Sequence, residues 1–288
     1  MIEIESCQAS GMRRPHLMIK HFGVLHPSRR RGLCEQLGRM LACLSLSVVC
    51  GCADNNHVRS VARDLTTAAA DAALHPMTWA PLSAGLMFIS TGVDETVSDW
   101  AADHQPLFGS TDRAADVSDV LRDSLRTGMF VSSIAVPMPP ANDRGNARGL
   151  RHMANNLAYQ TNRLGTDELK VAFGRERPNE ENNLSLPSGH TSTSFTAAAS
   201  IEQNFAMADL AANESMALKL GLYGLAGTTA WARLEARKHF PSDVFVGAAL
   251  GNFLSRFVLG AVLAVSGEPP MTFEGGADQI VFRLNHAL

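Results

Sequence analysis

The chain has 288 residues, 45% of them hydrophobic and 18% charged, which is enough to bury the core of one globular domain. Its formal net charge is −3, and 18 of the 25 basic residues but 25 of the 28 acidic residues lie beyond position 52. A surface that binds nucleic acid needs an excess of basic side chains, so this acidic body argues against nucleic acid as the main partner.

The N-terminal 52 residues follow the order of a secretory signal, in which basic residues precede an apolar run and then small residues. The basic residues Arg29–Arg31 precede an apolar run from Met40 to Val49. This run is shorter than the roughly 20 apolar residues that a stable membrane span requires. It ends in Val49-Cys50-Gly51-Cys52, which is similar to a bacterial lipobox.

This pattern predicts that residues 1–52 form a signal for lipoprotein export, with Cys52 as the lipidated residue. Residues 53–62 would then be a flexible tether, and residues 63–288 would form the folded domain. We expect the protein in the periplasm, anchored to the outer membrane through Cys52. The alternatives are an uncleaved N-terminal anchor or a buried helix, and the sequence leaves a homo-oligomer open.

The rest of the chain reads as an all-α helical bundle with a small C-terminal β-hairpin. Glycines and prolines separate the helical segments, and alternation around Gly275-Gly276 predicts the hairpin. The segment from Val244 to Gly267 is the longest apolar run, but Arg256 interrupts it, so we expect a buried core helix there. The expected helices are Ala62–Leu74, Trp79–Val93, Asp94–Leu107, Asp112–Ile134, Ala147–Phe173, Ser188–Met207, Asn213–Lys238 and Pro241–Val265, and the hairpin spans Met271–Leu284.

Three cations in the second half of the chain, Lys170, Arg177 and Arg233, are candidates for binding one small anion. The planar guanidinium of arginine matches the oxygens of a phosphate group, and lysine adds a point charge. Each of these residues taken alone is more often a solvated surface charge. Arg175, which lies between two of them, is expected to face solvent.

The segment Pro187-Ser188-Gly189-His190 opens one of the predicted helices. Backbone N–H groups at a helix start favour an anion, and Gly189 would let the backbone of Ser188 and Gly189 approach it closely. His190 would point toward the same anion. The plainer interpretation is a turn followed by a helix cap, with Ser188 as the N-cap.

His239 and Asp243 lie four residues apart at the start of the last long helix, which Pro241 begins. Asp243 can accept a hydrogen bond from one ring nitrogen of His239, which fixes the tautomer and leaves the other nitrogen nucleophilic. Such a pair is also common as a purely structural hydrogen bond. The order and spacing of the three clusters favour a shared task, and we expect their side chains to line one cavity around a tetrahedral oxyanion.

Together these residues resemble the three-part signature of the type 2 phosphatidic acid phosphatase superfamily, which includes acid phosphatases, lipid phosphatases and vanadium-dependent haloperoxidases. The resemblance is tight over residues 170–243, the expected catalytic core. One position departs from it, because Ala232 stands where the family usually has serine before the arginine. A secondary hydrogen bond would be lost there.

The resemblance implies a role for each residue. His239 would attack phosphorus and form a phosphohistidine, Asp243 would orient His239, and His190 would protonate the leaving oxygen and then activate water. The phosphate-binding groups would be Lys170, Arg177, Ser188, Gly189 and Arg233.

The resemblance therefore implies a phosphatase that needs no metal or other cofactor, and the sequence offers no carboxylate, histidine or cysteine cluster suited to magnesium or zinc. Its substrate would be a soluble phosphate monoester or a lipid phosphate or pyrophosphate. The alternatives are a vanadium-dependent haloperoxidase, with vanadate in place of phosphate, and a non-catalytic lipoprotein that has kept the pocket. The complete set of His190, His239 and Asp243 counts against the last.

Overall fold

The computed structural model describes residues 55–137, 144–206, 208, 210–266, 271–276 and 279–284. The described helices are α2 (Asn55–Leu74), α3 (Pro76–Thr91), α4 (Asp94–His104), α5 (Thr111–Ala135), α6 (Arg144–Phe173), α7 (Gly189–Phe205), α8 (Ala212–Glu235) and α9 (Pro241–Ser266). Two strands, β1 (Met271–Gly276) and β2 (Gln279–Leu284), follow.

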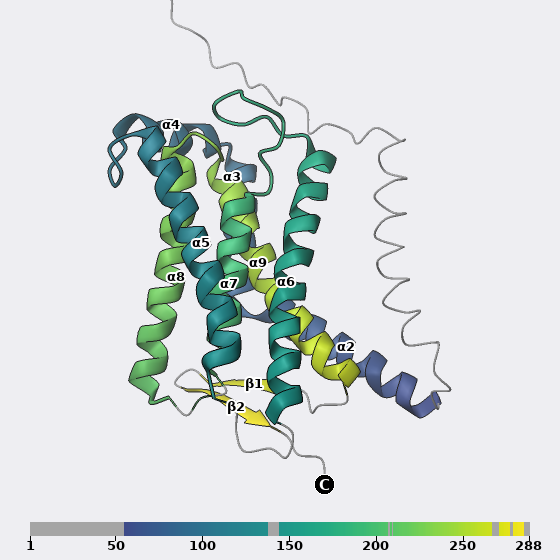
Figure 1. The fold of residues 1–288 in the computed structure, drawn as a ribbon. Helices are drawn as coiled ribbons and strands as arrows, with labels where there is room; N and C mark the ends of the chain where they lie inside the picture. Colours follow the sequence, from purple (N-terminus) through teal and green to yellow (C-terminus); the bar gives the residue numbers. More distant parts are fainter. Residues whose placement is uncertain are drawn as a thin grey trace, which may run out of the picture.

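The all-α bundle is confirmed, and α7 occupies its centre (Figure 1). This helix packs against α5, α6, α8 and α9. Every residue from Thr191 to Asn204 is buried, and most of them are alanine, serine or threonine. Small side chains let neighbouring helices approach closely on all sides, so this short, weakly amphipathic helix becomes the core of the bundle.

The closest approach in the bundle is between α7 and α9, and glycines on α9 permit it. A Cβ atom added to Gly247 would lie 2.8 Å from the carbonyl oxygen of Ser188, and one added to Gly251 would lie only 2.2 Å from that of Ser192. No residue other than glycine fits at these two positions without a shift of the backbone. The N-terminal halves of α7 and α9 are therefore held at a fixed separation.

Among the described residues, α9 alone is long and apolar enough to cross a membrane by length and composition. It contacts α2, α3, α6 and α7, and 61% of its most apolar stretch is buried inside the protein. Arg256, which interrupts this apolar run, is buried and donates to the Glu202 carboxylate at 2.6 Å. The arginine is thus compensated by a buried partner, as a charge in a protein interior requires.

The N-terminal boundary differs from the sequence expectation. Helix α2 begins at Asn55, so residues 55–62 are helical, whereas we expected residues 53–62 to be a tether. The second half of α2 packs on α9, where the Cβ of Ala68 lies 2.7 Å from the Cβ position of Gly260, whereas residues 58–60 near the start of the helix are exposed. The predicted export segment 1–52, with Cys52, lies outside the described residues and stays a prediction.

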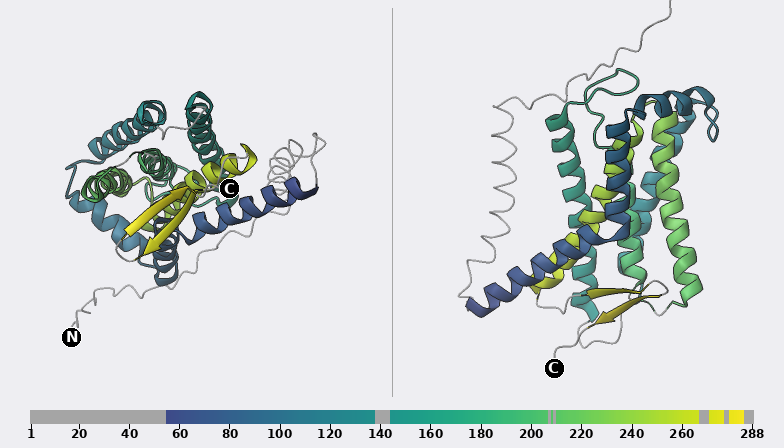
Figure 2. Two further views of the ribbon diagram at one scale, coloured as in Figure 1. Left: turned by 90° about the horizontal axis from the view of Figure 1, so that it is seen from below. Right: turned by 180° about the vertical axis from the view of Figure 1, so that it is seen from behind.

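The predicted C-terminal hairpin is present. Strands β1 and β2 pair antiparallel, with Met271 opposite Leu284 and Gly276 opposite Gln279. Figure 2 shows the two strands lying across one end of the bundle. The loop from Gly174 to Ser188, which joins α6 to α7, lies at the opposite end (Figure 1).

Candidate active site

The three sequence clusters meet at the end of the bundle that carries the Gly174–Ser188 loop. Lys170 lies in the last turn of α6, Gly189 begins α7, Arg233 lies in the last turn of α8, and Pro241 begins α9. Gly174, with φ of +59°, ends α6, and its N–H donates to the carbonyl oxygen of Lys170 at 2.9 Å. Antiparallel neighbours place two C-terminal and two N-terminal helix ends side by side (Figure 1).

His239 is held in the interior by the α6–α7 loop. Its side chain is 1% exposed, and its Nδ1 lies 2.8 Å from the carbonyl oxygen of Ser185. A carbonyl can only accept, so Nδ1 carries the hydrogen and Nε2 carries the lone pair. Burial, with the nearby Arg233 and Lys170, lowers the pKa of His239 to about 4 although Asp243 opposes the shift. The imidazole is therefore neutral at pH 7.

Asp243 lies near His239 but is not its direct hydrogen-bond partner, in contrast to the sequence expectation. The distance from His239 Nδ1 to Asp243 Oδ2 is 3.8 Å, longer than a hydrogen bond. Instead, Oδ2 accepts from the Ser185 hydroxyl at 2.5 Å and from the Phe240 N–H at 2.9 Å. Asp243 thus acts on the histidine through the Ser185 segment, whose carbonyl holds the ring. Sequence reasoning missed Ser185.

Arg175 was expected to face solvent and does not. Its Nη1 donates to Asp243 Oδ1 at 2.8 Å, its Nη2 donates to Asp94 Oδ2 at 2.9 Å, and its guanidinium lies 4.2 Å from the centre of the Phe240 ring. Asp94 also accepts from the Ser242 N–H at 2.8 Å. The arginine therefore joins α4, the α6–α7 loop and the start of α9.

These contacts keep the buried Asp243 ionised. Burial alone would raise the pKa of Asp243, but the neighbouring His239, the Arg175 guanidinium and the Ser185 hydroxyl outweigh it, so the pKa lies below its usual value. Nothing in the sequence near Arg175 points to Asp94, which precedes it by 81 residues.

The three predicted cations form a region of concentrated positive charge. Burial, followed by Arg177 and Arg233, lowers the pKa of Lys170, and burial with Arg177 lowers the pKa of Arg233 to about 10. Arg233 is 6% exposed and donates to the Ser118 hydroxyl through Nη1, at 3.0 Å. The Nε atoms of Arg177 and Arg233 are buried without a hydrogen-bond partner among the described residues. Like charges that depress each other's pKa favour a bound anion.

The start of α7 supplies fewer anion-binding groups than expected. The N–H of Ser188 donates to the backbone carbonyl of Asp243 at 3.0 Å, so it does not point at an anion. This bond joins α7 to α9 and is a consequence of their close packing. Gly189 is the first residue of α7, where a backbone N–H has no partner within the helix. A Cβ on Gly189 would lie 3.3 Å from Lys170 Nζ, so the glycine leaves room for the lysine ammonium.

His190 is in contact with two residues of α5 that sequence reasoning missed. Its Nε2 lies 2.7 Å from Asp119 Oδ1 and 2.7 Å from Arg122 Nη1. A protonated Nε2 can donate to the carboxylate, whereas an unprotonated Nε2 can accept from the guanidinium, so each protonation state has its own partner. Burial, followed by Arg233, lowers the pKa of His190 to about 3, although Asp119 opposes the shift.

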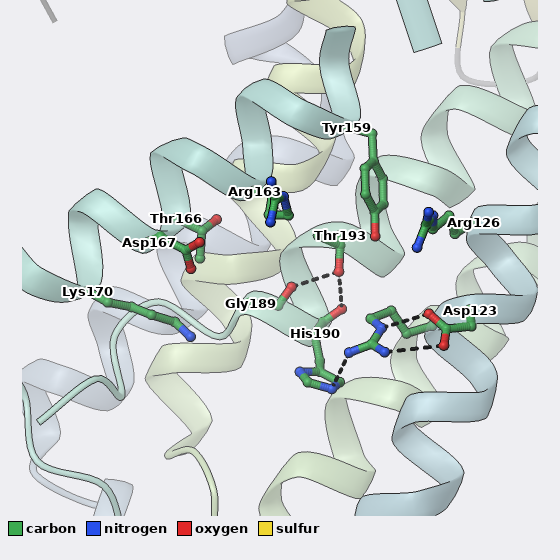
Figure 3. A pocket seen from close by; sticks show the side chains of 11 residues that line it. Asp123, Arg126, Tyr159, Arg163, Thr166, Asp167, Lys170, Gly189, His190 and Thr193 are labelled. Atoms are coloured by element: carbon green, nitrogen blue, oxygen red, sulfur yellow. Dashed lines mark hydrogen bonds and ion pairs between the residues drawn. The ribbon is translucent and has the colours of Figure 1, made fainter. Parts of the chain in front are cut away.

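A cavity of about 360 Å³ opens between α5, α6 and α7 beside this cluster. Lys170, Gly189 and His190 line it together with residues of α5 and α6 (Figure 3). Arg177, Arg233 and His239 do not line it, so the expected single cavity holds only for part of the set. His239 is still close enough to interact electrostatically with a residue of the cavity, since Lys170, together with Arg233, lowers the pKa of His239.

No group of three or more His, Cys, Asp or Glu side chains that could hold a metal ion occurs within the described part of the chain. Ala232, where the sequence resemblance leads one to expect serine, is fully buried in α8. The hydrogen bonds described for Ser185, Ser188 and Asp243 do not involve Ala232.

Helix ends that gather two imidazoles, one buried carboxylate and several cations define a candidate phosphoryl-transfer site. Comparison with known families agrees. Residues 153–265 match the model of the PAP2 superfamily, and this range contains every predicted catalytic residue.

Among solved structures, the chain is similar to a transmembrane PAP2-type phosphatidylglycerolphosphate phosphatase from Bacillus subtilis. The sequence identity is 19%, the match covers 63% of this chain and 92% of that chain, and the TM-score is 0.48. A search of curated proteins gave no match.

Proposed function

We propose that the protein is a metal-independent phosphatase that hydrolyses phosphate esters through a phosphohistidine at His239. The observation that carries this proposal is the state of His239 itself. Its Nδ1 is committed to the Ser185 carbonyl, and its lowered pKa of about 4 keeps Nε2 unprotonated at pH 7. A buried imidazole with a fixed tautomer and a free lone pair is a prepared nucleophile.

In the first step, His239 Nε2 attacks phosphorus, the bond from phosphorus to the ester oxygen breaks, and His190 gives a proton to the leaving oxygen. Burial, followed by the charge of Arg233, lowers the pKa of His190, and a bound phosphate dianion would raise this pKa by opposing that charge. Substrate binding would therefore favour the protonated form that acts as the acid.

In the second step, His190 takes a proton from water, the water oxygen attacks phosphorus, and the bond from phosphorus to His239 breaks to release phosphate. Lys170, Arg177 and Arg233 offset the charge that spreads over the phosphoryl oxygens in both transition states. Asp243 accepts hydrogen bonds from Ser185 and from Arg175, and these bonds fix the Ser185 segment against the start of α9.

The test compares wild type with His239→Ala and with His104→Ala, a matched change of an exposed histidine on α4. Phosphate release from phenyl phosphate is expected to fall by at least about 10³-fold in His239→Ala and to stay unchanged in His104→Ala. Wild type should also form an acid-labile protein phosphate that His239→Ala lacks.

Activity that persists in His239→Ala would refute the assignment of the nucleophile. Activity should also survive EDTA, since the proposed transition state is stabilised by arginine and lysine. A loss in EDTA that added divalent metal restores would point to a different mechanism.

A further inference from the structure

The cavity beside His190 is lined mainly by residues with charged or polar side chains, whose carbon atoms still form much of its surface. Among the described residues, no aliphatic, phenylalanine or methionine side chain lines it, and its aromatic rings are those of Tyr159 and His190. Four cations line it against two carboxylates, an excess of two positive charges: the cations are Arg122, Arg126, Arg163 and Lys170, and the carboxylates are Asp123 and Asp167. An acyl or isoprenyl chain in this cavity would lie against the charged groups and offer them no partner, so a polar ligand suits them better.

Three of these four cations, Arg126, Arg163 and Lys170, form no ion pair within the described residues, whereas Arg122 does. Arg122 forms a two-pronged contact with Asp123, at 3.1 Å from Nε and 3.3 Å from Nη2. By contrast, Arg126 places its guanidinium 5.4 Å from the centre of the Tyr159 ring. Arg163 makes only a 3.4 Å hydrogen bond to the side-chain oxygen of its neighbour Gln160.

Arg126 and Arg163 both lie away from the end of the cavity that Lys170 and His190 form. Tyr159, Arg163, Thr166 and Lys170 follow at intervals of four, three and four residues, so they share one face of α6. With a rise of about 1.5 Å per residue, Arg163 lies about 10 Å along the helix from Lys170. Figure 3 shows Tyr159 and Arg126 on the side of the cavity away from Lys170.

We propose that this cavity binds a phosphate ester whose leaving group carries a second anionic group, a carboxylate or a second phosphate, held by Arg126 and Arg163. This inference rests on the proposed function, in which the Lys170 and His190 end takes the phosphate that is cleaved. A guanidinium matches the oxygens of either anion. The guanidinium of Arg126 is oriented by its cation–π contact with the Tyr159 ring. The substrate would be a small polar molecule.

The experiment measures equilibrium binding by calorimetry with three non-hydrolysable ligands that share one ring. They are phenylphosphonate, 4-carboxyphenylphosphonate and 1,4-phenylenediphosphonate, and the last two distinguish a carboxylate from a second phosphate-like group. In wild type, the second anionic group is expected to strengthen binding about five- to tenfold, the gain of a partly exposed charge-assisted contact.

The double variant Arg126→Gln/Arg163→Gln should lose this gain while its affinity for phenylphosphonate changes less than about twofold. Arg113→Gln, which removes an exposed arginine of α5 outside the cavity, should keep the gain. Equal binding of all three ligands by wild type would overturn the proposal, and so would a gain that persists in the double variant.

Binding is read separately from turnover, so the two proposals can fail separately. Selective binding by a protein that does not hydrolyse phenyl phosphate would leave the second subsite standing and refute the phosphatase. Hydrolysis of phenyl phosphate without selective binding would leave the phosphatase standing and refute the second subsite.

Discussion

The contact between α7 and α9 at Gly251 is expected to set both the stability of the fold and the geometry of the site. A methyl group at this position would lie 2.2 Å from the carbonyl oxygen of Ser192, 2.9 Å from the N–H nitrogen of Thr196 and 3.0 Å from Cβ of Phe195. Ordinary van der Waals contact begins at 3.4 Å, so Gly251→Ala must displace the backbone of α7 relative to α9 by on the order of 1 Å.

The energetic effect follows from this displacement. Overpacking a dense core costs about 1–3 kcal/mol, and sometimes more, while alanine gains about 0.5–1 kcal/mol over glycine in a helix. We expect the variant to lose about 1–2 kcal/mol of unfolding free energy, which lowers Tm by about 2–8 °C.

The displacement also reaches the candidate site. Ser192 is one turn from Gly189, and α9 begins beside His239, so the separation between His190 and His239 must change. A misplacement of about 1 Å can cost about 10²-fold in rate, and we expect a loss of that order in kcat/KM for phenyl phosphate.

The assay pairs thermal unfolding with phosphate release, and Gly221→Ala on α8 is the matched control. No atom of the described residues lies within 4 Å of a Cβ built on Gly221, so alanine there should be neutral or slightly stabilising. If Gly251→Ala unfolds at the same temperature as Gly221→Ala and retains full activity, the close approach of α7 and α9 does not hold the site.

Charged groups at the site should affect both stability and activity. Because burial lowers the pKa of His239 to about 4 from its usual 6.5, the unfolded chain binds more protons between these pH values. The free energy of unfolding should therefore fall as pH drops from about 6.5 to 4. Chemical unfolding at several pH values should show a shallower fall for His239→Gln than for wild type, and parallel curves of unfolding free energy against pH would contradict this prediction. Arg175→Gln leaves two buried carboxylates without their cation, so we expect at least about a tenfold loss of activity and lower stability. Arg237→Gln, which breaks an exposed ion pair, should change stability by less than about 1 kcal/mol, and equal effects of the two variants in unfolding assays would contradict the bridging role of Arg175.

Much of the fold could be read from local pattern. The helices from α3 to α9 and the hairpin appear close to their expected bounds, because glycine, proline and apolar periodicity act through the backbone within a few residues. Arg256 in α9 likewise argued for a core helix, and its buried pairing with Glu202 agrees with that reading. Helix α2 begins seven residues before its expected start, and residues 58–60 there are exposed, so tertiary packing does not explain this difference.

The residue types available for the chemistry can be read from the chain alone, in the order Lys170, Arg177, His190, Arg233 and His239. Their hydrogen-bond partners depend on how the helices pack. Ser185, not Asp243, holds the ring of His239, and Arg175 turns inward to Asp243 and Asp94. The physical reason is that hydrogen bonds are short and directional, so a partner is chosen by atoms within about 3 Å, which helix packing sets and sequence spacing does not.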